Sequence, residues 1–271
     1  MKKKLFLFAL LFSSLLTACL SDDDDDGEKW DAAKVCPEEG TNSYGMPNRG
    51  TFTDERDGEV YRYTTIGDQV WMAENLRYEL PYPYSMCYGI EACYWHKRWE
   101  SDEVGETSCF KDTASLAEIA ETMNLSCKDN DCIAKAYCKK FGRYYSLKDK
   151  GENTRLLNRD VIDTVCPKGW HLPSKAEWEI LINNVENDAS RFLSSEAYLF
   201  KDSYALDNDI CGFSVLYAGR KIGENVEGLF KEAHFWTSSA KNQWSAEEVV
   251  VQRSIGVIGD CESISLRCLK D

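Results

Sequence analysis

Residues 166–181 read CPKGWHLPSKAEWEIL, and this stretch contains the clearest helix signal in the chain. Pro173 precedes the helix, Ser174 occupies the N-cap position, and Glu177 completes a capping box three residues later. One apolar stripe follows at helical spacing, formed by Trp178, Leu181, Ile182 and Val185. The sequence therefore predicts an amphipathic helix over residues 174–187.

Two shorter helices are predicted upstream of this one. Residues 113–124 carry apolar side chains at helical spacing behind a Ser115–Glu118 capping box. Residues 131–141 form the second candidate, which ends at Gly142.

The remaining elements are predicted to be strands. Residues 51–72 contain two tight-turn signals, Asp57-Gly58 and Gly67-Asp68, between β-branched and aromatic runs, which predicts a three-stranded meander. After residue 195 only short strands are expected, at 213–218, 234–237, 248–252, 254–258 and 263–269. Helices followed by a series of strands indicate an α+β domain with an antiparallel sheet.

Composition excludes some functions. The chain has 271 residues, with 32 Lys and Arg against 46 Asp and Glu, for a net charge of −14. Phosphate binding requires clustered cations, so no nucleic-acid partner is expected. Twelve cysteines are too many for a reducing compartment and indicate an exported protein stabilised by disulfides.

The first nineteen residues have the features of an export signal. Three lysines, Lys2 to Lys4, precede an apolar run over residues 5–16, which is short for a bilayer span. The Leu-Thr-Ala-Cys sequence at 16–19 resembles a bacterial lipobox, in which Cys19 is acylated and becomes the first residue of the mature chain. An ordinary cleaved signal peptide with an incidental cysteine is the alternative.

Residues 19–50 are predicted to be a solvated acidic tether, with order beginning near Gly50. The adjacent carboxylates of Asp22 to Asp26 repel one another and cannot pack together. In some bacterial groups such a run resembles a surface-export address. The expected organisation is a signal peptide over 1–18, the tether over 19–50, and one domain over 51–271.

Several segments resemble the Fibrobacter succinogenes major paralogous domain family. They are residues 50–77 with IGDQVWMAENL, FGRYY at 141–145, the 166–181 stretch, GFSVLYAGR at 212–220, FWTSS at 235–239 and SLRCLKD at 265–271. The 170–179 segment is also similar to the RLPTEAEWE helix start of formylglycine-generating enzymes.

This resemblance implies a C-type-lectin-like fold, with two main helices against a small twisted antiparallel sheet. Residues 88–137 are interpreted as an insertion stapled by disulfides. The family is typical of exported bacterial lipoproteins and implies no established activity, so the function has to be argued from the site.

The cysteine pairing is the next expectation. The resemblance implies a disulfide between Cys166 and Cys268. The next expected pairs are Cys211–Cys261 and Cys87–Cys138, with Cys127–Cys132 and Cys93–Cys109 within the insertion and Cys36 left in the tether. Zinc at Cys93 and His96 is the alternative for part of this set. The exported context and the absence of a CxxC motif favour disulfides, so no metal and no cofactor are expected.

No catalytic residue is predicted. The three histidines are His96, His171 and His234, and the last two lie within motif segments where a structural role is expected. Ser238 and Ser239 lack a GxSxG context. An oxidase of the formylglycine-generating type would require a reactive cysteine pair, whereas Cys261 and Cys268 are interpreted as structural.

Aromatic side chains are concentrated in residues 78–99. Flat rings stack on the apolar faces of sugars, which makes Tyr84, Tyr94, Trp95 and Trp99 the candidate binding residues. The alternative is that these rings pack the insertion against the domain. The EPN and WND triplets of calcium-dependent lectins are absent, and four other tryptophans are predicted to be core: Trp71, Trp170, Trp178 and Trp236.

The sequence therefore predicts an exported protein held at the outer membrane or cell surface through acylated Cys19. It is expected to act as a binding, adhesion or structural module whose partner is a glycan or another surface protein. The alternatives are an enzyme related to the formylglycine-generating oxidases and a purely structural envelope lipoprotein.

Overall fold

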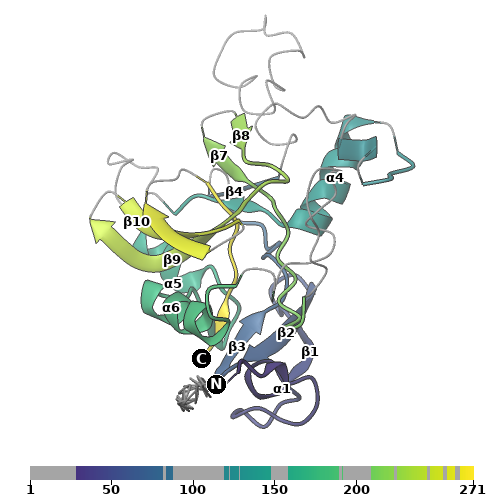
Figure 1. Cartoon of the computed structure of the whole chain (residues 1–271). Helices are drawn as coiled ribbons and strands as arrows, with labels where there is room; N and C mark the ends of the chain where they lie inside the picture. Colours follow the sequence, from purple (N-terminus) through teal and green to yellow (C-terminus); the bar gives the residue numbers. More distant parts are fainter. Residues whose placement is uncertain are drawn as a thin grey trace, which may run out of the picture. The chain divides into compact units, whose positions relative to one another are not determined.

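The computed structural model divides the chain into two units, Met1–Trp30 and Asp31–Asp271. The structure describes residues 29–81, 84–87, 119–121, 123–127, 129–147, 158–188, 191, 209–222, 225–242, 245–252, 255–259 and 263–271. In the second unit these residues form an α+β arrangement of small antiparallel sheets and short helices (Figure 1). No helix within the described ranges has the length and apolar character needed to cross a bilayer.

The first sheet has five strands in the order β1-β2-β3-β12-β6. β1 (Arg49–Thr53), β2 (Val60–Ile66) and β3 (Gln69–Met72) form the expected meander, with glycines of positive φ at both turns, Gly58 and Gly67. The late strand β12 (Leu269–Lys270) lies between β3 and β6 (Trp170–His171), because Leu269 pairs with both Trp71 and His171. Residues distant in sequence therefore complete this sheet.

The second sheet contains β9 (Ala233–Asn242), β10 (Ser245–Val251) and β11 (Ile255–Gly259) in antiparallel order. Two further pairs are short: β4 (Ser85–Met86) with β5 (Tyr144–Tyr145), and β7 (Arg220–Ile222) with β8 (Asn225–Glu227). The strands expected at 234–237, 248–252 and 254–258 are confirmed, with longer or shifted bounds.

Two of the expected helices are confirmed. α6 (Lys175–Asn184) begins at the predicted capping box, in which Ser174 and Glu177 each accept from the other's backbone N–H. α4 (Asn130–Phe141) begins after the N-cap residue Asp129 and ends at Gly142. Two short helices also occur, α1 (Ala32–Val35) and α5 (Arg159–Thr164). Most of the helix expected at 113–124 lies outside the described residues.

The two strands expected at 213–218 and 263–269 need correction. Ser214 and the preceding Gly212 have φ values of 54° and 64°, which are incompatible with extended backbone, so 213–218 is not a strand. Residues 263–265 form isolated bridges to three different segments, and only the end of 263–269 enters a strand.

The core is aromatic. Trp71, Trp178 and Trp236 are fully buried and Trp170 is 8% exposed, as predicted. Trp178 on α6 has its ring centroid 4.6 Å from that of Trp71 and 5.4 Å from that of Phe235 on β9. These contacts join α6 to both sheets.

Order begins earlier than Gly50, so the expected tether over 19–50 is wrong for its second half. Residues 31–48, termed here the N-terminal segment, fold onto the domain. Cys36 is 2% exposed, and Val35 accepts a 2.7 Å hydrogen bond from the Gly67 backbone N–H. The backbone carbonyl of Asn48 accepts from both the backbone N–H and the hydroxyl of Thr65.

Four disulfides are present among the described residues. Three have the expected partners: Cys166–Cys268, Cys87–Cys138 and Cys127–Cys132. The fourth is Cys36–Cys211, so the expected Cys211–Cys261 pair is wrong, because the N-terminal segment brings Cys36 to Cys211. Cys93, Cys109 and Cys261 lie outside the described residues.

Arg267 is the most unusual core residue, since its side chain is only 1% exposed. Its Nε donates to Asn75 Oδ1 at 2.9 Å, and its terminal nitrogens donate to the carbonyls of Phe213 and Ser214. The guanidinium carbon lies 4.4 Å from the Phe213 ring centroid and 5.3 Å from that of Phe235. Burial lowers the pKa of Arg267 to about 9.

The sizes of the disulfide loops predict their contributions to stability. Cys166–Cys268 spans 102 residues and Cys127–Cys132 spans five. In the chain-entropy relation, opening the long loop with Cys166→Ala and Cys268→Ala lowers the free energy of unfolding by about 4–5 kcal/mol, against about 2 kcal/mol for Cys127→Ala and Cys132→Ala. Urea unfolding of the two double variants measures the difference. Equal losses would contradict the loop-length argument.

Candidate functional site

The predicted aromatic cluster is described only in part. Tyr94, Trp95 and Trp99 lie outside the described residues. Tyr84 is half-buried, and its hydroxyl accepts a 3.1 Å hydrogen bond from Asn158 Nδ2 at the start of α5. Its backbone carbonyl also accepts from the Ser146 N–H. Tyr84 is therefore held in place by packing and hydrogen bonds to neighbouring segments.

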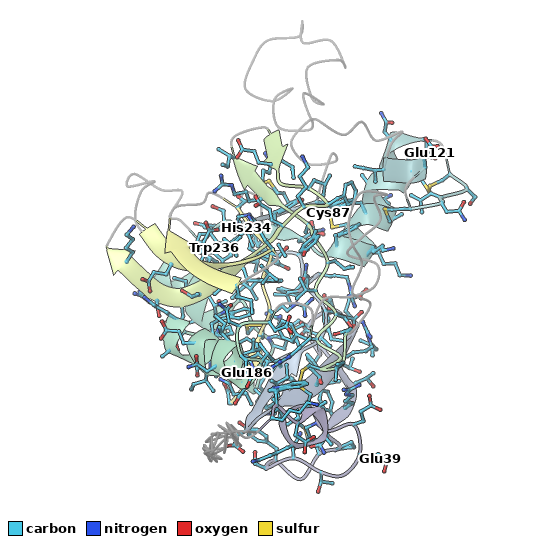
Figure 2. All side chains as sticks on the ribbon, in the orientation of Figure 1. Glu39, Cys87, Glu121, Glu186, His234 and Trp236 are labelled. Carbon is cyan, nitrogen blue, oxygen red and sulfur yellow. A yellow bond between two sulfur atoms is a disulfide. The ribbon has the colours of Figure 1, made fainter. Side chains whose placement is uncertain are left out.

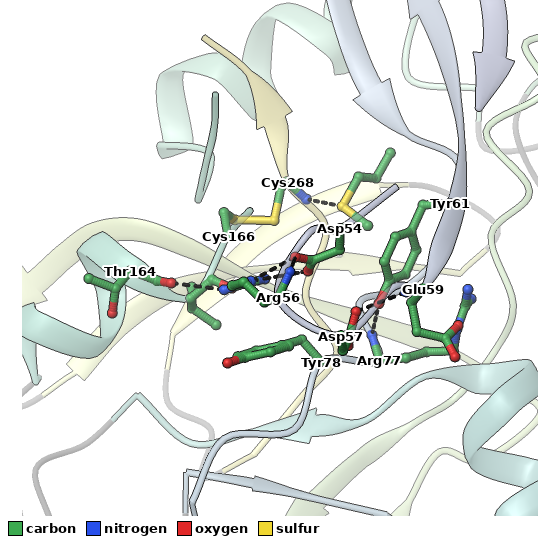
Figure 3. Close-up of polar contacts among 12 residues, drawn as sticks. Asp54, Arg56, Asp57, Glu59, Tyr61, Arg77, Tyr78, Thr164, Cys166 and Cys268 are labelled. Atoms are coloured by element: carbon green, nitrogen blue, oxygen red, sulfur yellow. Dashed lines mark hydrogen bonds and ion pairs between the residues drawn. A yellow bond between two sulfur atoms is a disulfide. The ribbon is translucent and has the colours of Figure 1, made fainter. Parts of the chain in front are cut away.

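An arginine–tyrosine contact lies where this aromatic region starts (Figure 3). The guanidinium carbon of Arg56 is 3.7 Å from the ring centroid of the half-buried Tyr78. Arg56 Nε and Nη2 also donate to the two oxygens of Asp54, at 2.9 and 2.7 Å. The fork of the guanidinium thus matches the carboxylate while its face covers the ring.

Asp54 and Arg56 differ in exposure. The Asp54 side chain is fully buried, and 24% of the Arg56 side chain is exposed. Burial opposes the charge of Arg56, but the hydrogen bond and the negative charge of Asp54 outweigh it and raise the pKa of Arg56. The remaining terminal nitrogen donates to the carbonyls of Thr164 and Val165 at the end of α5. The charge is therefore fixed in position between β1, α5 and Tyr78.

A second arginine–tyrosine contact lies beside the first (Figure 3). The guanidinium carbon of Arg77 is 4.4 Å from the Tyr61 ring centroid, and its Nε lies 3.0 Å from Glu59 Oε2. The Arg77 backbone N–H donates to the Tyr61 hydroxyl at 2.9 Å. Burial raises the pKa of Tyr61 well above its usual value, so the phenol stays neutral.

The local sequence explains how both contacts form. The turn between β1 and β2 closes when the Asp54 N–H donates to the Glu59 carbonyl and the Gly58 N–H donates to the Asp54 carbonyl, both at 2.8 Å. Gly58 supplies the φ of 79° that this turn requires. Residues 54–59 thus face Arg77 and Tyr78, which follow β3.

These residues had no sequence signal that separates them from an ordinary turn. Asp54 and Arg56 read as part of a hairpin connection, and their aromatic partner comes more than twenty residues later. Within this cluster no side chain pairs a nucleophile with a base. Tyr61 is fully buried and both arginines are paired with carboxylates, so these contacts hold the β1–β2 turn against the segment that follows β3.

His171 bridges two carboxylates. Its Nδ1 lies 2.7 Å from Asp271 Oδ1 and its Nε2 lies 3.0 Å from Glu177 Oε1. Burial works against the Glu177 charge, but hydrogen bonds from Ser174 and His171 outweigh it and lower the pKa of Glu177. The capping box and the histidine therefore share one carboxylate.

His234 is the buried counterpart, on β9 next to Trp236 (Figure 2). Its Nε2 lies 3.0 Å from Glu232 and its Nδ1 lies 3.3 Å from the fully buried Glu248. The hydrogen bond and charge of His234 outweigh the burial of Glu232 and lower the pKa of that carboxyl. Both described histidines thus have each ring nitrogen close to a carboxylate.

Metal binding can be assessed only for the described ranges. Within them, no group of three or more His, Cys, Asp or Glu side chains has the geometry to hold a metal ion. The alternative zinc ligands Cys93 and His96 lie outside these ranges.

Comparison with known sequences identifies the family to which the chain belongs. The described residues form an α+β domain with four disulfides. The sequence model of the Fibrobacter succinogenes major domain matches residues 64–270, so the chain belongs to that family. No curated protein and no solved structure matches the chain significantly.

The shared carboxylate predicts a specific pH dependence. The pKa of Glu177 is lowered in the folded state, so its stabilisation is present above the pKa of the unfolded chain and is lost as the pH falls through the folded pKa. Glu177→Gln keeps an acceptor for the capping box but removes the charge. We expect this variant to lose less stability than the wild type between pH 7 and about pH 3.

Urea unfolding at a series of pH values measures this effect. Glu179→Gln is the matched control, because Glu179 lies on the same helix and is exposed. The control should follow the wild-type pH dependence. An unchanged pH dependence in Glu177→Gln would contradict the assignment.

Proposed function

We propose that this protein is an exported, lipid-anchored module at the outer membrane or cell surface, where it binds a glycan or another surface protein. The observation that carries this proposal is the set of four disulfides, since such a density of cross-links suits an oxidising compartment. The lipobox at Cys19 and the family membership support the same location.

The proposed scaffold is C-type-lectin-like. It is supported by the small antiparallel sheets, by α6 packed against β9, and by a Cys166–Cys268 disulfide that ties the segment between α5 and β6 to the residue before the late strand β12. In this scheme the 88–137 insertion, which departs from the family pattern, is the part that contacts the ligand.

A second candidate is a purely structural envelope lipoprotein, favoured by how much of Tyr84 and Tyr61 is engaged in internal contacts. An enzyme related to the formylglycine-generating oxidases would require a reactive thiol. Cys268 is buried in a disulfide, which leaves Cys261 as the residue to test. Thiol titration of the folded protein at neutral pH distinguishes this case, because a reactive Cys261 would label rapidly.

Lipid anchoring is tested by metabolic labelling with palmitate in a bacterial host. We expect the wild-type chain to incorporate label and to fractionate with membranes, because several acyl chains give stable anchoring. Cys19→Ser should abolish both. Ser21→Ala is the control, since it alters the same segment without removing the thiol. Failure of the wild-type protein to incorporate palmitate would overturn the anchoring proposal.

Glycan binding is tested with a soluble fragment, residues 27–271, which contains the whole second unit. We expect binding on a glycan array, and about a fivefold or greater loss of affinity in Trp95→Ala or Trp99→Ala, since a stacked ring contributes on the order of 1 kcal/mol. Tyr44→Ala is the control, because Tyr44 is 43% exposed in the N-terminal segment, outside the aromatic cluster.

Failure of the fragment to bind any glycan would leave a protein partner or a structural role. Equal binding by both tryptophan variants and the wild type would move the ligand site away from residues 94–99.

A further inference from the structure

A disulfide fastens the N-terminal segment to the core of the domain. Cys36 lies just after α1, and its disulfide to Cys211 reaches a loop 175 residues later in the chain. Both cysteines are buried, with exposures of 2% and 0%. Tension applied to the chain before residue 31 therefore reaches this disulfide within a few residues along the chain.

The other attachments of the N-terminal segment are weaker. They consist mainly of a few hydrogen bonds, such as Gly67 N–H to Val35 carbonyl, and the Arg49–Glu38 ion pair, in which Glu38 is 72% exposed. Each such hydrogen bond contributes about 1 kcal/mol net, and exposed ion pairs contribute less. Without the disulfide, tension on the segment would load these contacts and then the edge strand β1.

The far end of the disulfide is fixed in the core. The Cys211 carbonyl accepts a 2.5 Å hydrogen bond from the hydroxyl of Thr64 on β2, and the Cys211 N–H donates to the Arg191 carbonyl. Two and three residues later, the carbonyls of Phe213 and Ser214 accept from the buried Arg267. The loop that contains Cys211 is thus held by hydrogen bonds from Thr64 on β2 and from Arg267.

We propose that Cys36–Cys211 is a mechanical strap, which carries tension from the N-terminal tether directly into the core and bypasses the chain between these two cysteines. The strap rests on the proposed anchoring for its biological load. Its physical behaviour does not depend on acylation, so the two proposals can fail separately.

The strap changes the shortest covalent path through the domain. In the oxidised protein this path crosses from Cys36 to Cys211, runs back to Cys166 and crosses again to Cys268. At about 3.5 Å per residue, full extension between Asp31 and Asp271 is about 20 nm.

Without the strap, the path must follow the chain from Asp31 to Cys87, cross to Cys138, and continue to the Cys166–Cys268 bond. The same arithmetic gives about 32 nm, so loss of the strap adds about 12 nm of extension.

Single-molecule pulling tests this difference, with tags at both ends of a chain that lacks only residues 1–18. We expect Cys36→Ser with Cys211→Ser to extend about 12 nm further than the wild type, and to begin yielding at lower force. Cys127→Ser with Cys132→Ser is the matched control, because that bond lies off the load path, and it should extend as the wild type does. Equal extension of the strap variant and the wild type would overturn the proposal.

A second measurement keeps both cysteines and avoids any folding defect. A protease site inserted at the exposed residues 43–45 is cut in the folded, oxidised protein. The tether should stay attached and the extension should stay at about 20 nm until reductant is added. Release of residues before the cut without reductant would overturn the strap, whereas loss of palmitate labelling at Cys19 would overturn only the anchoring.

Discussion

The fold depends on one buried cation. Arg267 is surrounded by carbonyls, one amide and two phenylalanine rings, and among the described residues no carboxylate forms an ion pair with it. Burying a charge costs free energy unless its hydrogen-bond donors have acceptors. Here the guanidinium N–H groups donate to acceptors on two other segments, and the residue thereby joins three segments of the chain. Because Cys268 and β12 follow directly, the same residue also sets where the sheet and the Cys166 disulfide close.

Local signals were sufficient for the elements that depend on local interactions. The α6 capping box and the meander turns involve residues within a few positions of each other, and both were predictable. The N-terminal segment was not, because its polar composition resembles a tether and its order depends on Cys211, Thr65 and Gly67. Residues 213–218 have strand composition, but Ser214 has a positive φ, and the carbonyls of Phe213 and Ser214 accept hydrogen bonds from the distant Arg267.

The candidate site shows the same division. Aromatic density draws attention to residues 78–99, most of which lie outside the described residues, and the sequence could not show that Arg56 covers the Tyr78 ring or that Asp54 holds Arg56 in place. Those contacts join a hairpin turn, the segment after β3 and the end of α5. Spacing along the chain carries no information about such a meeting, because it is created by the pairing of β1, β2 and β3.

The position of β12 has a consequence for biogenesis. β3 and β6 can become neighbours only after residues 269–270 have been translated, so the five-stranded sheet cannot close while the preceding chain is still emerging. The Cys36–Cys211 and Cys166–Cys268 bonds are also interleaved along the sequence. Oxidation in order of appearance would join wrong partners, so the native pairing of these cysteines depends on rearrangement of early bonds after the last strand has been made.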